Sequence, residues 1–169
     1  AGAAAALVWA ALDWIIQKKP TILGFATGGV AGLVVITPAA GYVTPLAALA
    51  IGALGAAASF GALKVRFRSK VDDALDVFAC HGVAGLVGAL LTGVFATTAV
   101  NPGGADGLLA GRPALLGLQA LSVVVALVFA GGALTGERVD RVVELGAFTV
   151  VHPESRLTAL GAAALVPLL

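Results

Sequence analysis

Residues 21–63 have the sequence TILGFATGGVAGLVVITPAAGYVTPLAALAIGALGAAASFGAL, which contains no aspartate, glutamate, lysine or arginine. A helix that crosses a membrane needs about 20 mostly apolar residues, so this stretch is long enough for two crossings. Its middle, residues 37–45, is rich in proline, glycine and threonine, which are typical of a break between helices. The stretch therefore predicts two consecutive membrane helices joined by a short turn.

The rest of the chain has the same character. Of its 169 residues, 60% are hydrophobic and 11% are charged, whereas soluble domains are about half apolar and a quarter charged. Further uncharged windows lie at residues 1–12, 77–105 and 113–136. We expect an all-α, polytopic transmembrane helical bundle of about five membrane helices, each roughly 20 residues long where complete. Their expected positions are about residues 1–16, 21–42, 45–65, 73–97 and 113–134. The first is short and starts without methionine, so we expect a fragment that begins inside a membrane helix.

Positive charges fall on alternate loops. Lys18 and Lys19 fill the first loop, and Arg138 and Arg141 follow the fifth helix. The third loop holds Lys64, Arg66, Arg68 and Lys70. If the five helices alternate in direction, all these residues lie on one side, which the positive-inside rule predicts to be cytoplasmic. The net charge of +1 and the lack of a basic tract speak against a nucleic-acid partner.

Small residues recur four positions apart on three of the expected helices. Such spacing lets membrane helices approach closely and predicts a tight bundle. The three series are Gly24, Gly28 and Gly32; Ala48, Gly52 and Ala56; and Gly85, Ala89 and Gly93.

His81 is the ionisable residue that interrupts the uncharged window 77–105. Val77 and Gly85, four residues away on either side, are expected to share its helix face. A neutral imidazole has one donor and one acceptor nitrogen, so inside an apolar tube it could bind a small polar solute or pass a proton. The alternative is a histidine bonded to a neighbouring helix. Polar groups at membrane depth are costly and usually functional, which favours the first interpretation.

Carboxylates cluster just before this helix, at Asp72, Asp73 and Asp76. They suit a helix N-terminus as capping groups, and Asp76, nearly a turn deeper, could instead shape the cytoplasmic mouth of a pore. Asp13, close to Trp9, is expected to anchor the first helix at the headgroup level.

No arrangement in the sequence indicates catalysis or a cofactor. Cys80 is a single cysteine, which excludes an internal disulfide and a cysteine-based metal site and fits a small buried side chain. The second histidine, His152, is expected outside the membrane, so we predict no metal site. No nucleophile–base pair or phosphate loop is evident, and we do not expect an enzyme.

Several segments resemble the ammonium transporter family, the Amt, Mep and Rh group, and its bacterial and plant Amt branch in particular. They are a Trp-x3-Asp-Trp-x4-Lys-Pro pattern at residues 9–20, GGVAGLVVITPAAGYV at 28–43, DDALDVF at 72–78, HGVAG at 81–85 and TGVFA at 92–96. The resemblance covers about residues 1–136, which we expect to be the C-terminal part of a transporter transmembrane domain.

The resemblance implies a homotrimer in the cell (inner or plasma) membrane, with a cytoplasmic C-terminus and one narrow apolar pore per subunit. Each subunit would have eleven helices, of which the five here would be the seventh to the eleventh. His81 matches the second of two pore histidines, and Val77 matches an apolar pore-lining position on its cytoplasmic side. Asp76 matches a carboxylate near the inner mouth, and Asp73 the acidic residue before it. The family mechanism would recruit ammonium at an outer aromatic site, deprotonate it and pass ammonia along the apolar lumen.

Residues 137–169 form an atypical tail. Gly136, Arg138, Val139, Glu144, His152 and Glu154 follow the order of family tails, but Pro153 stands where a glycine is expected. The predicted function is ammonium or ammonia transport, with a P-II type nitrogen-signalling protein as a possible cytoplasmic partner. The odd tail leaves an alternative open, namely an ammonium sensor that keeps the transporter fold.

Overall fold

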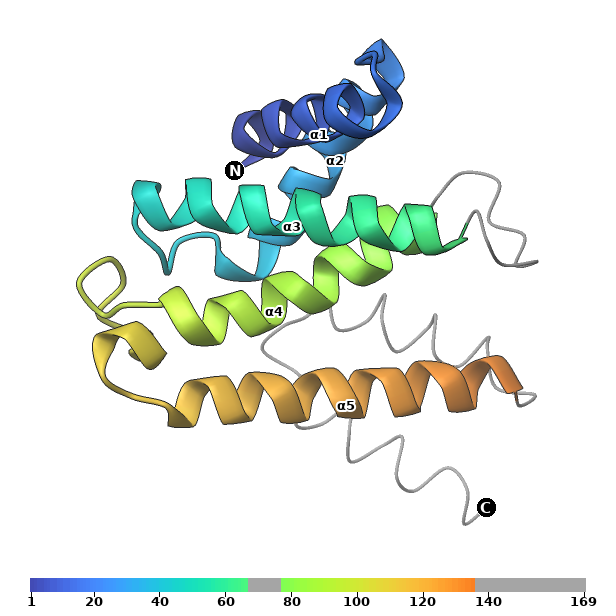
Figure 1. Cartoon of the computed structure of the whole chain (residues 1–169). Coiled ribbons are helices and arrows are strands. Elements are labelled where there is room, and N and C mark those ends of the chain that lie inside the picture. The colour runs from blue at the N-terminus through green and yellow to red at the C-terminus, as the bar shows by residue number, and fades with distance from the viewer. Residues whose placement is uncertain (67–76, 136–169) are drawn as a thin grey trace, which may run out of the picture. The chain divides into compact units, whose positions relative to one another are not determined.

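In the computed structural model, the residues described are 1–66 and 77–135, and every regular element within these two ranges is helical. The elements are α1 (Gly2–Gln17), α2 (Ile22–Ile36), η1 (Thr37–Ala39), α3 (Pro45–Arg66), η2 (Phe78–Val83), α4 (Ala84–Phe95), η3 (Leu108–Ala110) and α5 (Ala114–Thr135) (Figure 1). A compact unit covers Ala1–Val123, and a second unit begins at Val124, inside α5. The predicted all-α class is confirmed.

Three apolar helical stretches in the described ranges are long enough to cross a membrane, namely Ile22–Ala39, Pro45–Arg66 and Phe78–Phe95. Two more are apolar but shorter, Gly2–Gln17 and Ala114–Ala130. At 1.5 Å per residue, the 16 residues of α1 extend about 24 Å, less than the ~30 Å hydrocarbon core of a bilayer. The five expected crossings therefore correspond to five apolar helical segments in the described ranges, of which α1 is short, whereas α5 has 22 residues, as many as α3.

Local sequence explains where these helices begin and end. α1 ends at Lys18, whose φ of 64° is left-handed, two residues before Pro20. Thr21 then caps α2, because its hydroxyl accepts a hydrogen bond from the Gly24 N–H at 2.9 Å. α2 ends at Ile36, sooner than the expected residue 42, since Pro38 cannot donate to the helix ladder and the chain tightens into η1.

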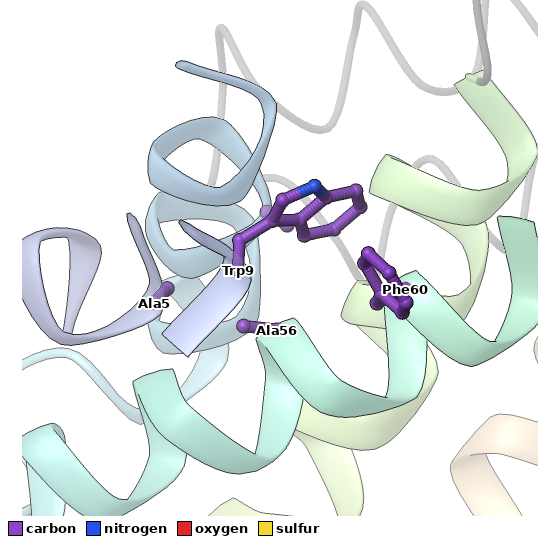
Figure 2. Packing of buried hydrophobic residues seen from close by; sticks show 5 residues of the cluster. Ala5, Trp9, Ala56 and Phe60 are labelled. Atoms are coloured by element: carbon purple, nitrogen blue, oxygen red, sulfur yellow. The ribbon is translucent and has the colours of Figure 1, made fainter. Parts of the chain in front are cut away.

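The first cluster of buried side chains joins α1, α2 and α3 (Figure 2). Its members are Ala5, Trp9, Ala31, Ala56 and Phe60. The rings of Trp9 and Phe60 meet edge to face, with centroids 5.2 Å apart and planes at 79°, a favoured aromatic geometry. Lys64 Nζ lies 5.0 Å from the Phe60 ring centroid, within cation–π range. These contacts hold α1 against the end of α3.

A second cluster, made of Val35, Ala39, Ile51 and Ala84, joins the end of α2 to α3 and α4. Glycines let the backbones approach in both clusters. A Cβ atom at Gly28 would lie 2.9 Å from Trp9 Cγ, and one at Gly32 would lie 2.9 Å from Gly2 Cα. The close packing expected of these two residues is therefore confirmed.

The third predicted series, on α4, is partly wrong. A Cβ atom at Gly85 would meet nothing within 4 Å, whereas one at Gly93 would lie 2.7 Å from Leu116 Cα. The buried stripe of α4 is instead Ala84, Gly88, Thr92 and Gly93. The predicted series is therefore open at Gly85 and packed at Gly93 within the described structure.

Candidate functional site

His81 lies in η2, a π-helical segment that spans Phe78–Val83 and leads directly into α4. The sequence predicted a regular α-helix here, and the wider turn is a finding of the structure. A Cβ atom at Gly82 would lie 3.0 Å from the Phe78 ring, tighter than ordinary packing, so glycine makes room for this ring. π-helical turns are rare, and they occur frequently at functional sites.

The two sides of η2 differ sharply in burial. Ala79 is 2% exposed and Cys80 is 5% exposed, so this side packs into the bundle. Cys80 is thus a small buried side chain, as expected. On the other side His81 is exposed, and so are Val77 at 47% and Phe78 at 65%. His81 and Val77, the two residues predicted to line a pore, therefore lie in the same exposed part of the helix.

His81 is not locked into packing. Within the residues that the structure describes, its imidazole makes no hydrogen bond, and no group of three or more metal-ligating side chains is found. Its backbone carbonyl accepts from the N–H of Ala84, which closes the end of the π-helical segment. An imidazole has two ring nitrogens that can take part in hydrogen bonds.

The expected acidic part of the site falls outside the described residues. Asp72, Asp73 and Asp76 lie in the gap between residues 66 and 77. His152 and the predicted tail, residues 137–169, lie after the last described residue.

Asp13, expected to anchor the first helix at the headgroup level, lies buried inside the bundle. It is 2% exposed, as is Trp9, so neither side chain faces lipid. Its carboxylate accepts hydrogen bonds from the Gln17 amide and, at 3.3 Å, from the Thr21 hydroxyl. Because Thr21 also caps α2, Asp13 links the end of α1 to the start of α2. The sequence signal was a carboxylate placed eight residues before a threonine cap.

The loop between α4 and α5 contains a second polar cluster, which the sequence did not reveal. The backbone N–H and the hydroxyl of Thr98 both donate to Asp106 Oδ1, at 2.7 and 2.9 Å. Of these the backbone bond contributes most to holding the pKa of the Asp106 carboxyl below its ordinary value of 3.8, and the Arg112 charge lowers it further. Thr97 donates its N–H to the Tyr42 carbonyl at 2.9 Å. The loop is thereby tied to the turn after α2.

Long apolar helices, close glycine contacts and an exposed imidazole within one span define a multi-pass α-helical membrane protein. Comparison with known proteins narrows this class. The pattern of the Ammonium Transporter Family matches residues 1–136. The chain therefore belongs to the ammonium transporter family, and the resemblance noted in its motifs is confirmed.

Individual relatives support this family membership. An ammonium transporter of Bacillus subtilis is 48% identical over 130 residues, which are 76% of this chain and 32% of that protein. An ammonium transporter of Aquifex aeolicus is 41% identical over 161 residues, 89% of this chain and 38% of that protein. The chain thus spans about a third of the length of these curated relatives.

Solved structures show the same fold. The crystal structure of Candida albicans Mep2 matches with a TM-score of 0.74 at 29% identity and covers 92% of this chain and 33% of that one. Saccharomyces cerevisiae Mep2 matches with a TM-score of 0.72 at 34% identity, covering 75% of this chain and 30% of that one. The fold is therefore that of part of an ammonium transporter bundle.

Proposed function

We propose that this chain forms one wall of a narrow apolar path through which ammonium or ammonia crosses the membrane. His81 and Val77 line the path, and Asp76 and Asp73 lie near its cytoplasmic mouth. The exposure of His81 within an otherwise apolar span is the observation that carries this proposal.

An imidazole facing hydrocarbon leaves its donor and acceptor nitrogens without partners, which costs several kcal/mol. Lipid is therefore an unfavourable neighbour for the exposed side of η2. A cover made of protein, with a lumen between, removes that cost because a passing solute bonds to the ring. The chain spans about a third of its relatives' length, so a complete transporter has further helices to supply this cover.

The apolar surface of this wall favours a neutral solute over an ion. An isolated ion moved from water into an apolar lumen loses tens of kcal/mol of solvation, whereas a neutral molecule loses only its hydrogen bonds, about 4–8 kcal/mol for each unpaired polar group. Val77 and Phe78 contribute apolar surface, and His81 can replace one lost hydrogen bond. Such a wall favours ammonia over a bare ammonium ion, with the proton handled separately.

The rest of the proposal concerns assembly and orientation. Three lysine and arginine clusters on alternate loops support a cytoplasmic C-terminus in the cell membrane. Membership of the family supports a homotrimer and a P-II type signalling partner as part of this proposal. The P-II partner would meet the side that carries the tail.

The test is uptake of labelled methylammonium by cells that make the full-length protein, with either His81→Ala or Leu121→Ala. Leu121 is a matched control because it is exposed and apolar, on α5. We expect His81→Ala to lower uptake about tenfold, since a lost hydrogen bond of about 1.4 kcal/mol in the path corresponds to that factor. Leu121→Ala should leave uptake unchanged.

Two results would contradict the proposal. Equal uptake by His81→Ala and Leu121→Ala, at equal amounts in the membrane, would remove His81 from the path. No uptake by the unaltered protein, combined with an ammonium-dependent change in its tail, would favour the sensor instead.

A further inference from the structure

Gly85 follows His81 by four residues in the helix formed by η2 and α4, which places both residues on about the same face. A Cβ atom at Gly85 would meet nothing within 4 Å in the part of the chain that the structure describes. At about 1.5 Å per residue, Gly85 lies roughly 6 Å further along the helix axis than His81. The exposed imidazole is therefore followed, one turn later, by a position that has no side chain.

The corresponding position one turn before His81 is occupied by a branched side chain. Val77 precedes His81 by four residues and is 47% exposed. Along the helix axis, the imidazole thus has an isopropyl group on one side and bare backbone on the other. The positive charges of the loops predict that the end of the helix at residue 77 is cytoplasmic. The unoccupied space is therefore expected on the outer side of His81.

Packing within the described residues explains two other glycines of α4, but it does not explain Gly85. A Cβ atom at Gly88 would lie 3.0 Å from the Val35 carbonyl carbon, and one at Gly93 would lie 2.7 Å from Leu116 Cα. Both positions therefore need glycine for close contact with a neighbouring segment. Glycine inside a helix is less favourable than alanine, so an open glycine beside His81 calls for a reason other than these contacts.

We propose that Gly85 sets the size of the solute that can bind at His81, and that the space beside it accepts the methyl group of a methylated amine. This inference rests on the proposed conduction path at His81. The nitrogen of methylamine forms a hydrogen bond with the imidazole. Its methyl group points toward Gly85, because Val77 occupies the other side of the ring. Ammonia has no methyl group and does not need this space.

The experiment compares the uptake of labelled ammonium and labelled methylammonium by cells that make the full-length protein or its Gly85→Ala variant. We expect the ratio of methylammonium to ammonium uptake to fall about tenfold, the lower end of the discrimination that one carbon atom produces in an apolar pocket. Gly61→Ala is the matched control, because Gly61 lies in α3 and a Cβ atom there also meets nothing within 4 Å. It should leave the ratio unchanged.

A double variant, Gly85→Ala with Val77→Ala, moves the free space to the other side of the imidazole, and we expect it to raise the ratio again. The role of Gly85 is overturned, and the conduction path is kept, if His81→Ala lowers the uptake of both solutes but Gly85→Ala leaves their ratio unchanged. It is also overturned if Gly85→Ala reduces the amount of folded protein in the membrane, because Gly85 would then pack against another helix. Unchanged uptake of both solutes in His81→Ala would overturn the conduction path and this inference together.

Discussion

The helix formed by η2 and α4 has one side that is buried and one side that is exposed. On one side Ala79, Ala84 and Gly88 are buried against α2 and α3, and a Cβ atom at Gly88 would lie 3.0 Å from the Val35 carbonyl carbon. On the other side His81 is exposed, and Gly85 has open space around it. Both sides contain small residues, so residue size alone does not distinguish them.

The two sides differ in the hydrogen bonding of the polar side chain that lies beside the small residues. The packed side continues as a stripe of alanine, glycine and a threonine whose hydroxyl is satisfied within the helix, since Thr92 Oγ1 donates to the Gly88 carbonyl at 2.8 Å. The open side continues with an imidazole that makes no such bond. In this helix, the small residues beside the satisfied Thr92 hydroxyl form a helix contact, whereas Gly85, beside His81, has open space within the described structure.

The largest expected effect tests the same contrast between a buried side and an exposed side on α1, which has one tryptophan on each side. Trp9 is 2% exposed and packs on Phe60, whereas Trp14 is 68% exposed. We expect Trp9→Ala to lower the free energy of unfolding by about 3–5 kcal/mol because it leaves a cavity. Trp14→Ala should change it by less than about 1 kcal/mol. Denaturant unfolding in detergent measures both, and equal losses would show that the outer side of α1 is also packed.

The next prediction compares the two glycines of α4. Gly88→Ala places a Cβ atom against the backbone of Val35, which cannot move aside, so we expect a loss of about 1–3 kcal/mol in unfolding free energy. Gly85→Ala meets nothing within 4 Å and should gain up to about 1 kcal/mol from helix propensity. Thermal unfolding of both variants checks this. A large loss at Gly85 would mean that further helices press against the open side.

The smallest effect concerns the loop after α4, where Asp106 accepts two bonds from Thr98. The pKa of Asp106 is lower in the folded protein than its ordinary 3.8. The unfolded loop therefore binds the proton more readily. Stability from this contact is present above about pH 4 and is lost as the pH falls through the lower folded value.

Hydrogen exchange of the Thr98 amide between pH 6 and pH 3, corrected for intrinsic rates, measures this loss. We expect protection to decrease in acid in the unaltered protein. Asp106→Asn keeps the shape of the side chain but has no charge to lose, so its protection should be lower and independent of pH. A pH-dependent decrease of the same size in that variant would assign the effect to another group.

Much of the fold could be predicted because membrane helices require long uncharged apolar stretches, which are visible in the sequence. The uncharged stretch of residues 21–63 was long enough for two spans, and the structure has helices at Ile22–Ala39 and Pro45–Arg66. Motif resemblance then identified the family and singled out His81 and Val77. Their exposure agrees with a pore wall, but their contact with a solute stays a prediction.

The parts that could not be predicted depend on how each helix is rotated about its own axis. Asp13 beside tryptophans has the composition of an interfacial anchor, and only the direction of α1 shows that it points inward to Thr21. The choice between the Gly85 and Gly88 series likewise depends on rotation about one helix axis. The π-helical turn at His81 has no composition signal, because it differs from an α-helix by a single residue in its hydrogen-bond spacing.

That turn also gives the helix a point at which its length can change. A π-helical turn holds one residue more than the α-helical turn it replaces. Removal of one residue within Phe78–Val83 converts the segment to ordinary helix and keeps Ala84, Gly88 and Thr92 in phase with α2. The same deletion inside α4 rotates every later side chain by about 100°. We therefore expect a one-residue deletion beside His81 to leave the register of α4 unchanged.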